Sequence, residues 1–181
     1  MKHVILGAGP AGVIAAETIR KHAPADEIVL VGDEPEAPYS RMAIPYLLMG
    51  NVGEAGTHLR HDPTHYAKLR ITVQRGRLAA KVDIKARTVT LDDGSTLDWD
   101  RLLIATGSSP AAPPIPGMNL PGVHPCWTLK DARERFERDY VTAVLEHHRG
   151  RMGAAAKELG IERTNLYRKI KQLNIRWTIP D

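Results

Sequence analysis

Three glycines close to the N-terminus, Gly7, Gly9 and Gly12, have the spacing G-x-G-x-x-G, which suits binding of a dinucleotide pyrophosphate. The first glycine permits a tight turn, the second lets the backbone approach the phosphates, and the third lets a helix pack closely on a strand. The amino end of that helix offers unpaired N–H groups and a positive dipole end to the phosphates. Asp33 lies 21 residues beyond Gly12. An acid at about that distance (~20 residues) can hold a ribose hydroxyl.

Other side chains that could be reactive are few. The single cysteine, Cys126, excludes an internal disulfide and a thiolate metal cluster, and it fits a reducing compartment. Nothing adjacent to Cys126 would lower the pKa of its thiol, so we expect no catalytic role for it. His58, His61 and His65 suggest a metal site, but zinc sites take four ligands in recognised spacings. We therefore expect no bound metal.

The elements around the glycines follow an α/β order. Residues 2–6 are apolar and predict a strand, residues 13–22 predict a helix that ends before Pro24, and the β-branched run 27–31 predicts a buried parallel strand. From Val73 onward we expect a β-meander, with strands over 78–83 and 88–91 and a D-G hairpin turn before 96–97. Residues 99–107 predict a further buried strand. This pattern predicts a Rossmann-like half-domain with a meander.

Residues 1–132 resemble the FAD-binding start of the pyridine nucleotide–disulfide oxidoreductases, closest to the nitrite-, rubredoxin- and ferredoxin-reductase type. The resemblance rests on the glycine turn, the acid after the second strand, the segment 38–48 and the A-T-G sequence at 105–107. It implies FAD as the cofactor, with Arg41 near the pyrophosphate and backbone near Ala79 facing the adenine. Some relatives have a redox cysteine where this chain has Ser-Arg-Met, so no thiol nucleophile is present there. The expected cofactor-binding residues are Gly7, Ala8, Gly9, Pro10, Ala11, Gly12, Asp33, Glu34, Arg41, Ala79, Ala105, Thr106 and Gly107.

The last 49 residues differ from the rest in charge and pattern. Residues 133–181 carry 11 Lys and Arg against 7 Asp and Glu, whereas residues 1–132 carry 14 of each, so the net charge of +4 belongs to this part. A local basic patch is typical of a protein that binds a polyanion, although a solvated helix face could carry the same charge. Three amphipathic helices are expected, and the apolar face of the first contains Phe136, Tyr140, Val141, Val144 and Leu145.

Residues 151–170 resemble the Fis-type helix-turn-helix domain that ends sigma-54-dependent activators, with small residues, a turn glycine and a basic second helix in the matching order. The resemblance implies double-stranded DNA as the partner, and a homodimer, because such modules read two half-sites. Arginine can pair with guanine and asparagine with adenine, whereas lysine neutralises phosphates. Tyr167 suits either a phosphate contact or the core. The expected DNA-binding residues are Arg163, Thr164, Asn165, Tyr167, Arg168 and Lys169.

The sequence predicts two domains, an oxidoreductase-like domain over 1–132 and a DNA-binding domain over 133–181. A second glycine motif for NAD(P)H and a Gly-Asp motif for the flavin are not found after Ala132, so we do not expect catalysis by this chain alone. Three interpretations remain open. They are a flavin- or redox-linked DNA-binding regulator, an FAD-dependent NAD(P)H oxidoreductase fragment completed by another polypeptide, and an accidental join of two gene fragments. The N-terminus is not typical of a signal peptide and no segment suits a membrane span, so we expect a cytoplasmic protein.

Overall fold

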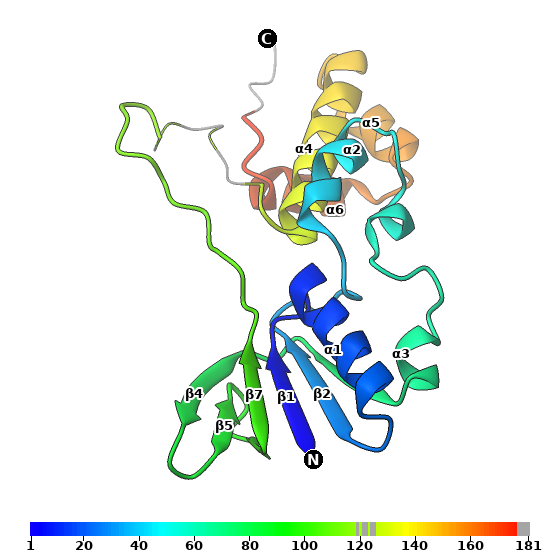
Figure 1. The fold of residues 1–181 in the computed structure, drawn as a ribbon. Helices are drawn as coiled ribbons and strands as arrows, with labels where there is room; N and C mark the ends of the chain where they lie inside the picture. The colour runs from blue at the N-terminus through cyan, green and yellow to red at the C-terminus, as the bar shows by residue number, and fades with distance from the viewer. Residues whose placement is uncertain (119, 121–122, 124–125, 177–181) are drawn as a thin grey trace. The chain divides into compact units, whose positions relative to one another are not determined.

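The chain forms two compact units, Met1–Ile115 and Pro116–Asp181, in a computed structural model that describes residues 1–118, 120, 123 and 126–176 (Figure 1). The first unit is a mixed α/β structure with a parallel sheet, and the second is helical. Both fold classes agree with those predicted from the sequence.

The first unit is built on a parallel sheet in the order β3-β2-β1-β7. Because all four strands run the same way, their carboxyl ends meet at one edge, where ligands bind in open α/β sheets. The strands are β1 (Lys2–Leu6), β2 (Glu27–Gly32), β3 (Ile71–Arg75) and β7 (Arg101–Ile104).

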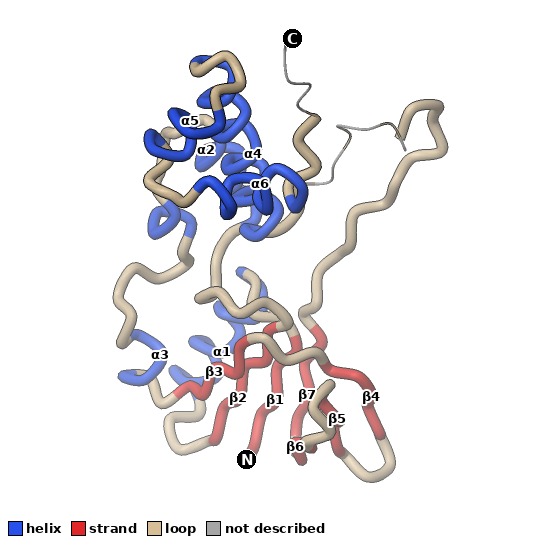
Figure 2. Tube along the Cα trace, turned by 180° about the vertical axis from the view of Figure 1, so that it is seen from behind, coloured by secondary structure: helices blue, strands red, loops and turns tan. Residues whose placement is uncertain are grey.

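The sheet is the middle layer of the unit. Alternate residues of a strand point to opposite faces, so Val4 and Leu6 face one side of the sheet and Ile5 faces the other. On the Ile5 side the sheet packs against helix α1 (Pro10–His22), which buries Val13 and Ala16. On the opposite side it packs against an antiparallel sheet in the order β4-β5-β6, as the view from behind shows (Figure 2). These strands are β4 (Ala79–Asp83), β5 (Thr88–Leu91) and β6 (Thr96–Asp98).

Two strand predictions need correction. The meander does not start at Val73, because Val73 lies in β3 and pairs in parallel with Leu30 of β2. The strand over 99–107 is not buried. It forms β7, the outer strand of the parallel sheet, and Ile104 is 65% exposed. A short apolar run is compatible with either environment, since strand pairing and neighbours decide which side chains are covered.

Residues 40–68 cross the carboxyl side of the sheet between β2 and β3 as a series of short helical turns. Residues 50–66 contain one complete short helix and the start of another. Its backbone is tied to the segment after β2, since Ser40 N donates to Thr57 O at 2.9 Å and Leu59 N donates to Pro38 O at 2.9 Å. The elements are η1 (Arg41–Ala43), α2 (Ile44–Leu48), η2 (Glu54–Thr57) and α3 (His65–Lys68).

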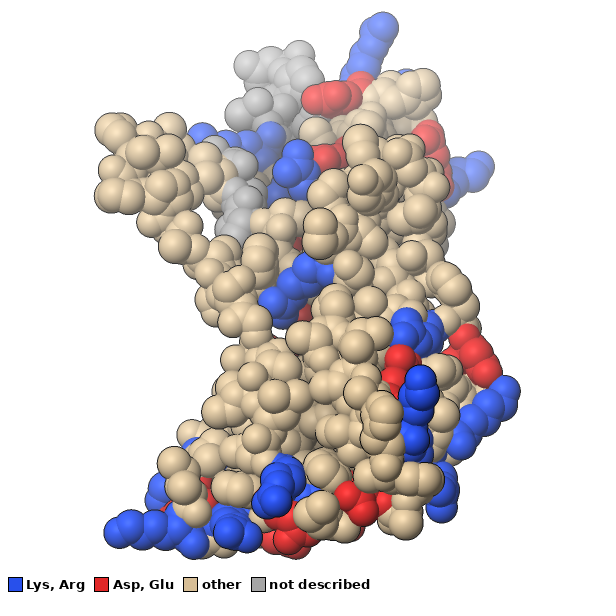
Figure 3. All heavy atoms as spheres, viewed as in Figure 1, with Lys and Arg blue, Asp and Glu red and all other residues tan. Residues whose placement is uncertain are grey.

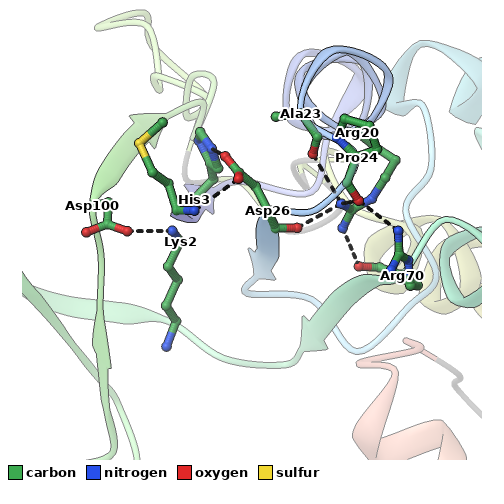
Figure 4. A network of polar contacts seen from close by, with 9 residues as sticks. Lys2, His3, Arg20, Ala23, Pro24, Asp26, Arg70 and Asp100 are labelled. Atoms are coloured by element: carbon green, nitrogen blue, oxygen red, sulfur yellow. Dashed lines mark hydrogen bonds and ion pairs between the residues drawn. The ribbon is translucent and has the colours of Figure 1, made fainter.

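Arg20 links α1 to the segments that precede β2 and β3, at the end of the first unit opposite the carboxyl edge. It is 9% exposed on the last turns of α1, and its guanidinium lies among backbone carbonyls at the amino ends of β2 and β3 (Figure 4). A buried charge needs its donors satisfied, and carbonyl oxygens do this here. Arg20 donates to the carbonyl oxygens of Leu69, Ala23, Pro24, Asp26 and Arg70 at 2.6, 3.4, 2.8, 2.7 and 2.8 Å.

The described residues of the second unit form the helices α4 (Leu129–His147), α5 (Met152–Glu158) and α6 (Arg163–Gln172). A capping box starts α4, in which Asp131 N donates to the Thr128 hydroxyl and the Asp131 carboxylate accepts from Thr128 N at 2.9 Å. The helices share one core, in which Leu145, Ala155 and Leu166 are fully buried.

The apolar face predicted for α4 is partly wrong. Val141, Val144 and Leu145 face the core, as expected, but Phe136 and Tyr140 are 64% and 50% exposed. Their rings stack on one another with centroids 6.2 Å apart. Residues 136 and 140 are one helical turn apart, so they share a face that lies beside the core face and is not part of it.

Candidate functional site

The turn after β1 is shaped by the first glycine of the motif. Gly7 has φ +111°, and a Cβ at this position would lie 2.2 Å from the Ala105 carbonyl oxygen. Gly7 N donates to Val31 O at 2.8 Å, and Ala105 N donates to Leu6 O at 2.7 Å. Only glycine fits where two backbones approach this closely with a positive φ. The turn therefore sits at the carboxyl edge of the sheet, directly against the residues that follow β7.

The other glycines of this edge divide into packed and open positions. A Cβ on Gly12 would lie 1.9 Å from Gly7 O, so this glycine is required for α1 to pack under the turn. A Cβ on Gly9 would meet nothing within 4 Å. The motif therefore leaves open space at its second glycine, as a cradle for a phosphate group requires. Gly32 was not among the predicted residues, yet it lets Ala8 approach the end of β2 closely. Its position immediately before Asp33 could have pointed to this role.

Helix α1 presents its amino end beside this open space. Gly9 is the N-cap with extended backbone, Pro10 occupies the first helical position, and Val13 N is the donor to Gly9 O. The N–H groups of the first turn precede that bond and have no partner within the helix. With 13 residues, α1 also brings a full macrodipole to the turn. Ala8 and Gly9 are half-buried, while Pro10 and Ala11 are exposed.

The two acids after β2 have different surroundings. Asp33 is exposed, whereas Glu34 is half-buried and accepts hydrogen bonds from the Tyr39 hydroxyl at 2.7 Å and from Arg41 at 2.8 Å. Arg41 is therefore held close to the carboxyl edge by an ion pair with Glu34. A guanidinium is a group that suits phosphate oxygens. Tyr39 was missed by the sequence analysis, because a tyrosine in a loop carries no pattern.

The segments after β3 and β7 reach the same edge. Gly107 has φ +72°, and Thr106 is exposed. Arg77 N donates to Gly32 O at 2.9 Å, which brings the chain just before Ala79 against the end of β2. The fold thus gathers the predicted residues around the ends of β1, β2 and β7, with Ala79 at the start of β4. Figure 3 shows charged side chains along the lower margin of this unit, which is the amino end of β1, away from this edge.

Of the histidines considered for a metal, His65 forms a side-chain contact with a carboxylate. His65 Nε2 contacts the Glu17 carboxylate at 2.8 Å, and Arg60 donates twice to the same carboxylate at 2.7 and 2.6 Å. The hydrogen bond from Arg60 and that from His65 lower the pKa of Glu17. His58 forms an antiparallel bridge with Tyr39. Within the described ranges, His58, His61 and His65 do not come together as a ligand group.

Cys126 shows no sign of activation. The thiol is free and half-buried, and burial together with the nearby Asp131 carboxylate raises its pKa. A raised pKa leaves less thiolate, which is the nucleophilic form.

In the second unit, α5 and α6 form a helix-turn-helix. Gly160 has φ +65°, and Ile161 N donates to Ala156 O at 3.0 Å, which is a Schellman-type end for α5. Leu166 of α6 is fully buried against the core, which fixes the rotation of the helix. The opposite face of α6 is consequently turned outward.

The predicted DNA-binding residues lie on or beside that outward face. Arg163, Thr164, Tyr167 and Arg168 are exposed, and Asn165 and Lys169 are half-buried. Arg163 donates to the Tyr167 hydroxyl at 3.1 Å, with its guanidinium over the tyrosine ring. Arg168 donates to the Asn165 side chain at 3.0 Å. These surface contacts orient the side chains. Breaking the contacts costs little, because exposed pairs of this kind contribute only a few tenths of a kcal/mol (~0.2–0.5).

Two residues of α4 fix the position of α6 and were missed. Glu137 forms an ion pair with Lys169, and Arg138 donates to Leu173 O at 2.8 Å at the end of α6. Lys169 thus has an ion-pair partner on α4, whereas the hydrogen-bond partners of Arg163 and Arg168 given above lie on α6 itself. The pairing joins residues 32 positions apart, so sequence spacing gave no signal for it.

Comparisons with known proteins identify relatives of both units. Residues 1–144 match the family described as pyridine nucleotide-disulphide oxidoreductase, and residues 132–173 match the family of bacterial regulatory proteins, Fis family. The two matches overlap within α4. None of the helices in the described residues is long and apolar enough to cross a membrane.

Individual relatives match the first part of the chain. Rhodocoxin reductase of Rhodococcus erythropolis is 35% identical over 132 residues, covering 73% of this chain and 31% of that protein. An NADH oxidase of Methanocaldococcus jannaschii is 36% identical over 138 residues, covering 74% and 31%. A NAD-dependent persulfide reductase from A. fulgidus has a TM-score of 0.68 at 31% identity, covering 76% of this chain and 26% of that one. The chain therefore spans about a third of the length of the curated relatives it matches.

Proposed function

The chain belongs to the pyridine nucleotide-disulphide oxidoreductase family and also carries a Fis-family module, and we propose that it is a flavin-linked DNA-binding protein. The observation that carries the proposal is the pairing, in one chain, of an open phosphate cradle at Gly9 with a helix-turn-helix whose second helix is exposed and basic. The proposal assigns 1–132 to the flavin-binding part and 133–181 to the DNA-binding part. Access to a bacterial chromosome requires a cytoplasmic location.

The ligand proposed for the first unit is FAD, held by its ADP half. The cradle supports this because Gly7 and Gly12 leave no room for a Cβ, whereas Gly9 faces the open space that a pyrophosphate needs. The turn at 7–12 and the amino end of α1 would hold the pyrophosphate together with Arg41, and Asp33 with Glu34 would hold the ribose. Ala79 and the residues 105–107 would supply backbone around the cofactor. Bound FAD would provide one- and two-electron redox chemistry.

The second unit would bind duplex DNA as a homodimer through α6. Arg163, Thr164, Asn165 and Arg168 would face the major groove. Lys169 would neutralise phosphates, and Tyr167 would contact a phosphate or support the helix. The exposed face opposite Leu166 supports this assignment. A flavin that alters DNA affinity would make the protein a redox-linked regulator.

The flavin part of the proposal is tested by reconstituting the purified chain with FAD and measuring the visible spectrum and the FAD dissociation constant. Gly9→Ala is the informative variant, because its Cβ meets no protein atom yet would stand where phosphate must approach. We expect this variant to keep its circular dichroism spectrum and to lose FAD affinity at least tenfold. A chain that binds no FAD, or a Gly9→Ala variant with unchanged affinity, would contradict the cradle.

The DNA part is tested by fluorescence anisotropy with labelled duplexes over a range of salt. We expect salt-dependent binding and a loss of about 1–3 kcal/mol in Arg168→Ala. Arg135→Ala is the matched control, since Arg135 is an exposed arginine of the same unit outside the helix-turn-helix. Equal affinities of the wild type and Arg168→Ala would remove α6 as the reading helix. Equal DNA affinity with oxidised and dithionite-reduced FAD would remove the redox link while leaving DNA binding intact.

A second candidate function is that of an FAD-dependent reductase fragment whose remaining parts are supplied by another polypeptide. The identity of 35% to rhodocoxin reductase favours it. Oxidation of NADH by the FAD-loaded chain, alone or after addition of a candidate partner, would support this function over the regulator.

A further inference from the structure

A cluster of metal-ligating side chains lies where α4 ends and α5 closes against it. His147 is the last residue of α4, His148 is its C-cap, and Glu158 is the last residue of α5. One ligand atom from each of the three lies within 4.8 Å of the other two. His148 Nε2 and a Glu158 carboxylate oxygen are already 2.5 Å apart. These residues form no part of the glycine cradle or of the exposed face of α6.

We propose that His147, His148 and Glu158 bind a divalent transition-metal ion of the zinc type. Two imidazoles and one carboxylate are a ligand set that zinc accepts, with water in the remaining position. Bonds of about 2.0–2.2 Å in a tetrahedral arrangement put ligand atoms about 3.3–3.6 Å apart. The observed cluster therefore needs only a small side-chain adjustment to close on an ion.

The backbone holds the cluster in place. The chain reverses after α4 through Arg149 and Gly150, both with positive φ, and Gly150 N donates to Leu145 O at 2.9 Å. Leu145 and Ala155, on the two helices that carry the ligands, are fully buried in the shared core. The two helix ends are thus positioned by packing and not by the His148–Glu158 contact alone. A rigid scaffold of this kind lowers the entropy cost of assembling ligands.

Nearby charges set an upper limit on affinity. His147 and Glu158 are exposed, and the single carboxylate is the site's one negative ligand. Arg149, Arg151 and Lys157 are neighbours in the chain, and Arg151 donates to His148 O at 3.3 Å. These cations oppose the binding of a metal cation by Coulomb repulsion. We expect reversible binding that links α4 to the first helix of the helix-turn-helix.

The test uses the full chain after treatment with EDTA, titrated with Zn²⁺ by calorimetry and with Co²⁺ by visible absorption. We expect one ion per chain, a tetrahedral cobalt spectrum and no thiolate charge-transfer band, because Cys126 lies outside the cluster. His147→Ala, His148→Ala and Glu158→Gln are each expected to weaken binding at least tenfold. His61→Ala, an exposed histidine in the other unit, is the matched control and should bind as the wild type does.

His147→Ala keeps the test decisive if removal of the His148–Glu158 contact unfolds the second unit, since His147 is exposed at the helix end. Failure of the wild type to bind Zn²⁺ or Co²⁺ would overturn the proposal. Unchanged binding in His147→Ala and Glu158→Gln would do the same, because the ion would then lie elsewhere.

Discussion

Replacing Arg20 with methionine is expected to lower the free energy of unfolding of the first unit by about 3 kcal/mol. The guanidinium donates five hydrogen bonds to backbone carbonyls, and no carboxylate takes part in these bonds. The carbonyls of Ala23 and Pro24 keep other donors, Asp26 N and the Arg70 side chain. The estimate therefore counts the remaining three, at Leu69, Asp26 and Arg70, at about 1 kcal/mol each. Methionine has a similar length, so the change removes donors and leaves little cavity.

The assay is hydrogen exchange followed peptide by peptide across a urea series, because the chain has two units that can unfold separately. Peptides from β2 and β3 should lose protection in Arg20→Met, while peptides from α5 and α6 should not. Arg20→Lys keeps the charge but offers fewer donors without the planar fork, so it should recover about 1 kcal/mol of the loss. A loss below 1 kcal/mol in Arg20→Met, or an equal effect on α6, would refute the reasoning.

Three further changes test other parts of the structure. Gly12→Ala places a Cβ 1.9 Å from Gly7 O and should cost about 3 kcal/mol or more in urea unfolding, whereas Gly9→Ala should change stability little. Glu17→Gln removes a carboxylate whose pKa Arg60 and His65 hold below its ordinary value. At a pH above its ordinary pKa the ionised Glu17 carboxylate stabilises the fold, and this stabilisation is lost as the pH falls through the lowered pKa of the folded protein. Between neutral pH and acid, the wild type should therefore lose more stability than Glu17→Gln. Equal pH profiles in acid unfolding would contradict this. Thr128→Ala should cost the second unit about 1 kcal/mol and increase exchange in the first turn of α4, with Thr128→Ser as the control that keeps the hydroxyl.

The sequence predicted those structural features that depend on residues close together in the chain. Gly7, Gly9 and Gly12 could be assigned to a turn because backbone sterics restrict such positions to glycine, and Gly160 ends α5 for a related reason. The small residues of the helix-turn-helix and the spacing of Val141, Val144 and Leu145 predicted part of the helical core. These features depend on neighbours within a few positions, which the sequence displays directly.

Features set by distant neighbours could not be predicted. Residues 71–75 carry no sequence pattern that assigns them to one sheet, and only pairing with β2 makes them part of the parallel sheet. Phe136 and Tyr140 fit an apolar helix face, and only the packing of α5 and α6 shows that this face is uncovered. The pairings of Arg20 with Leu69 and of Lys169 with Glu137 span 49 and 32 positions, so no spacing rule reports them.

The outer strand β7 has a consequence for how the protein behaves in concentrated solution. An outer parallel strand offers one row of backbone groups to any further strand, and here exposed apolar side chains at Leu103 and Ile104 accompany it. Natural proteins usually protect such strands with charges, prolines or covering segments. The four residues of β7 contain a single charge, Arg101, at the end remote from the cradle. Pairing between chains along this strand would therefore compete with correct folding at high protein concentration.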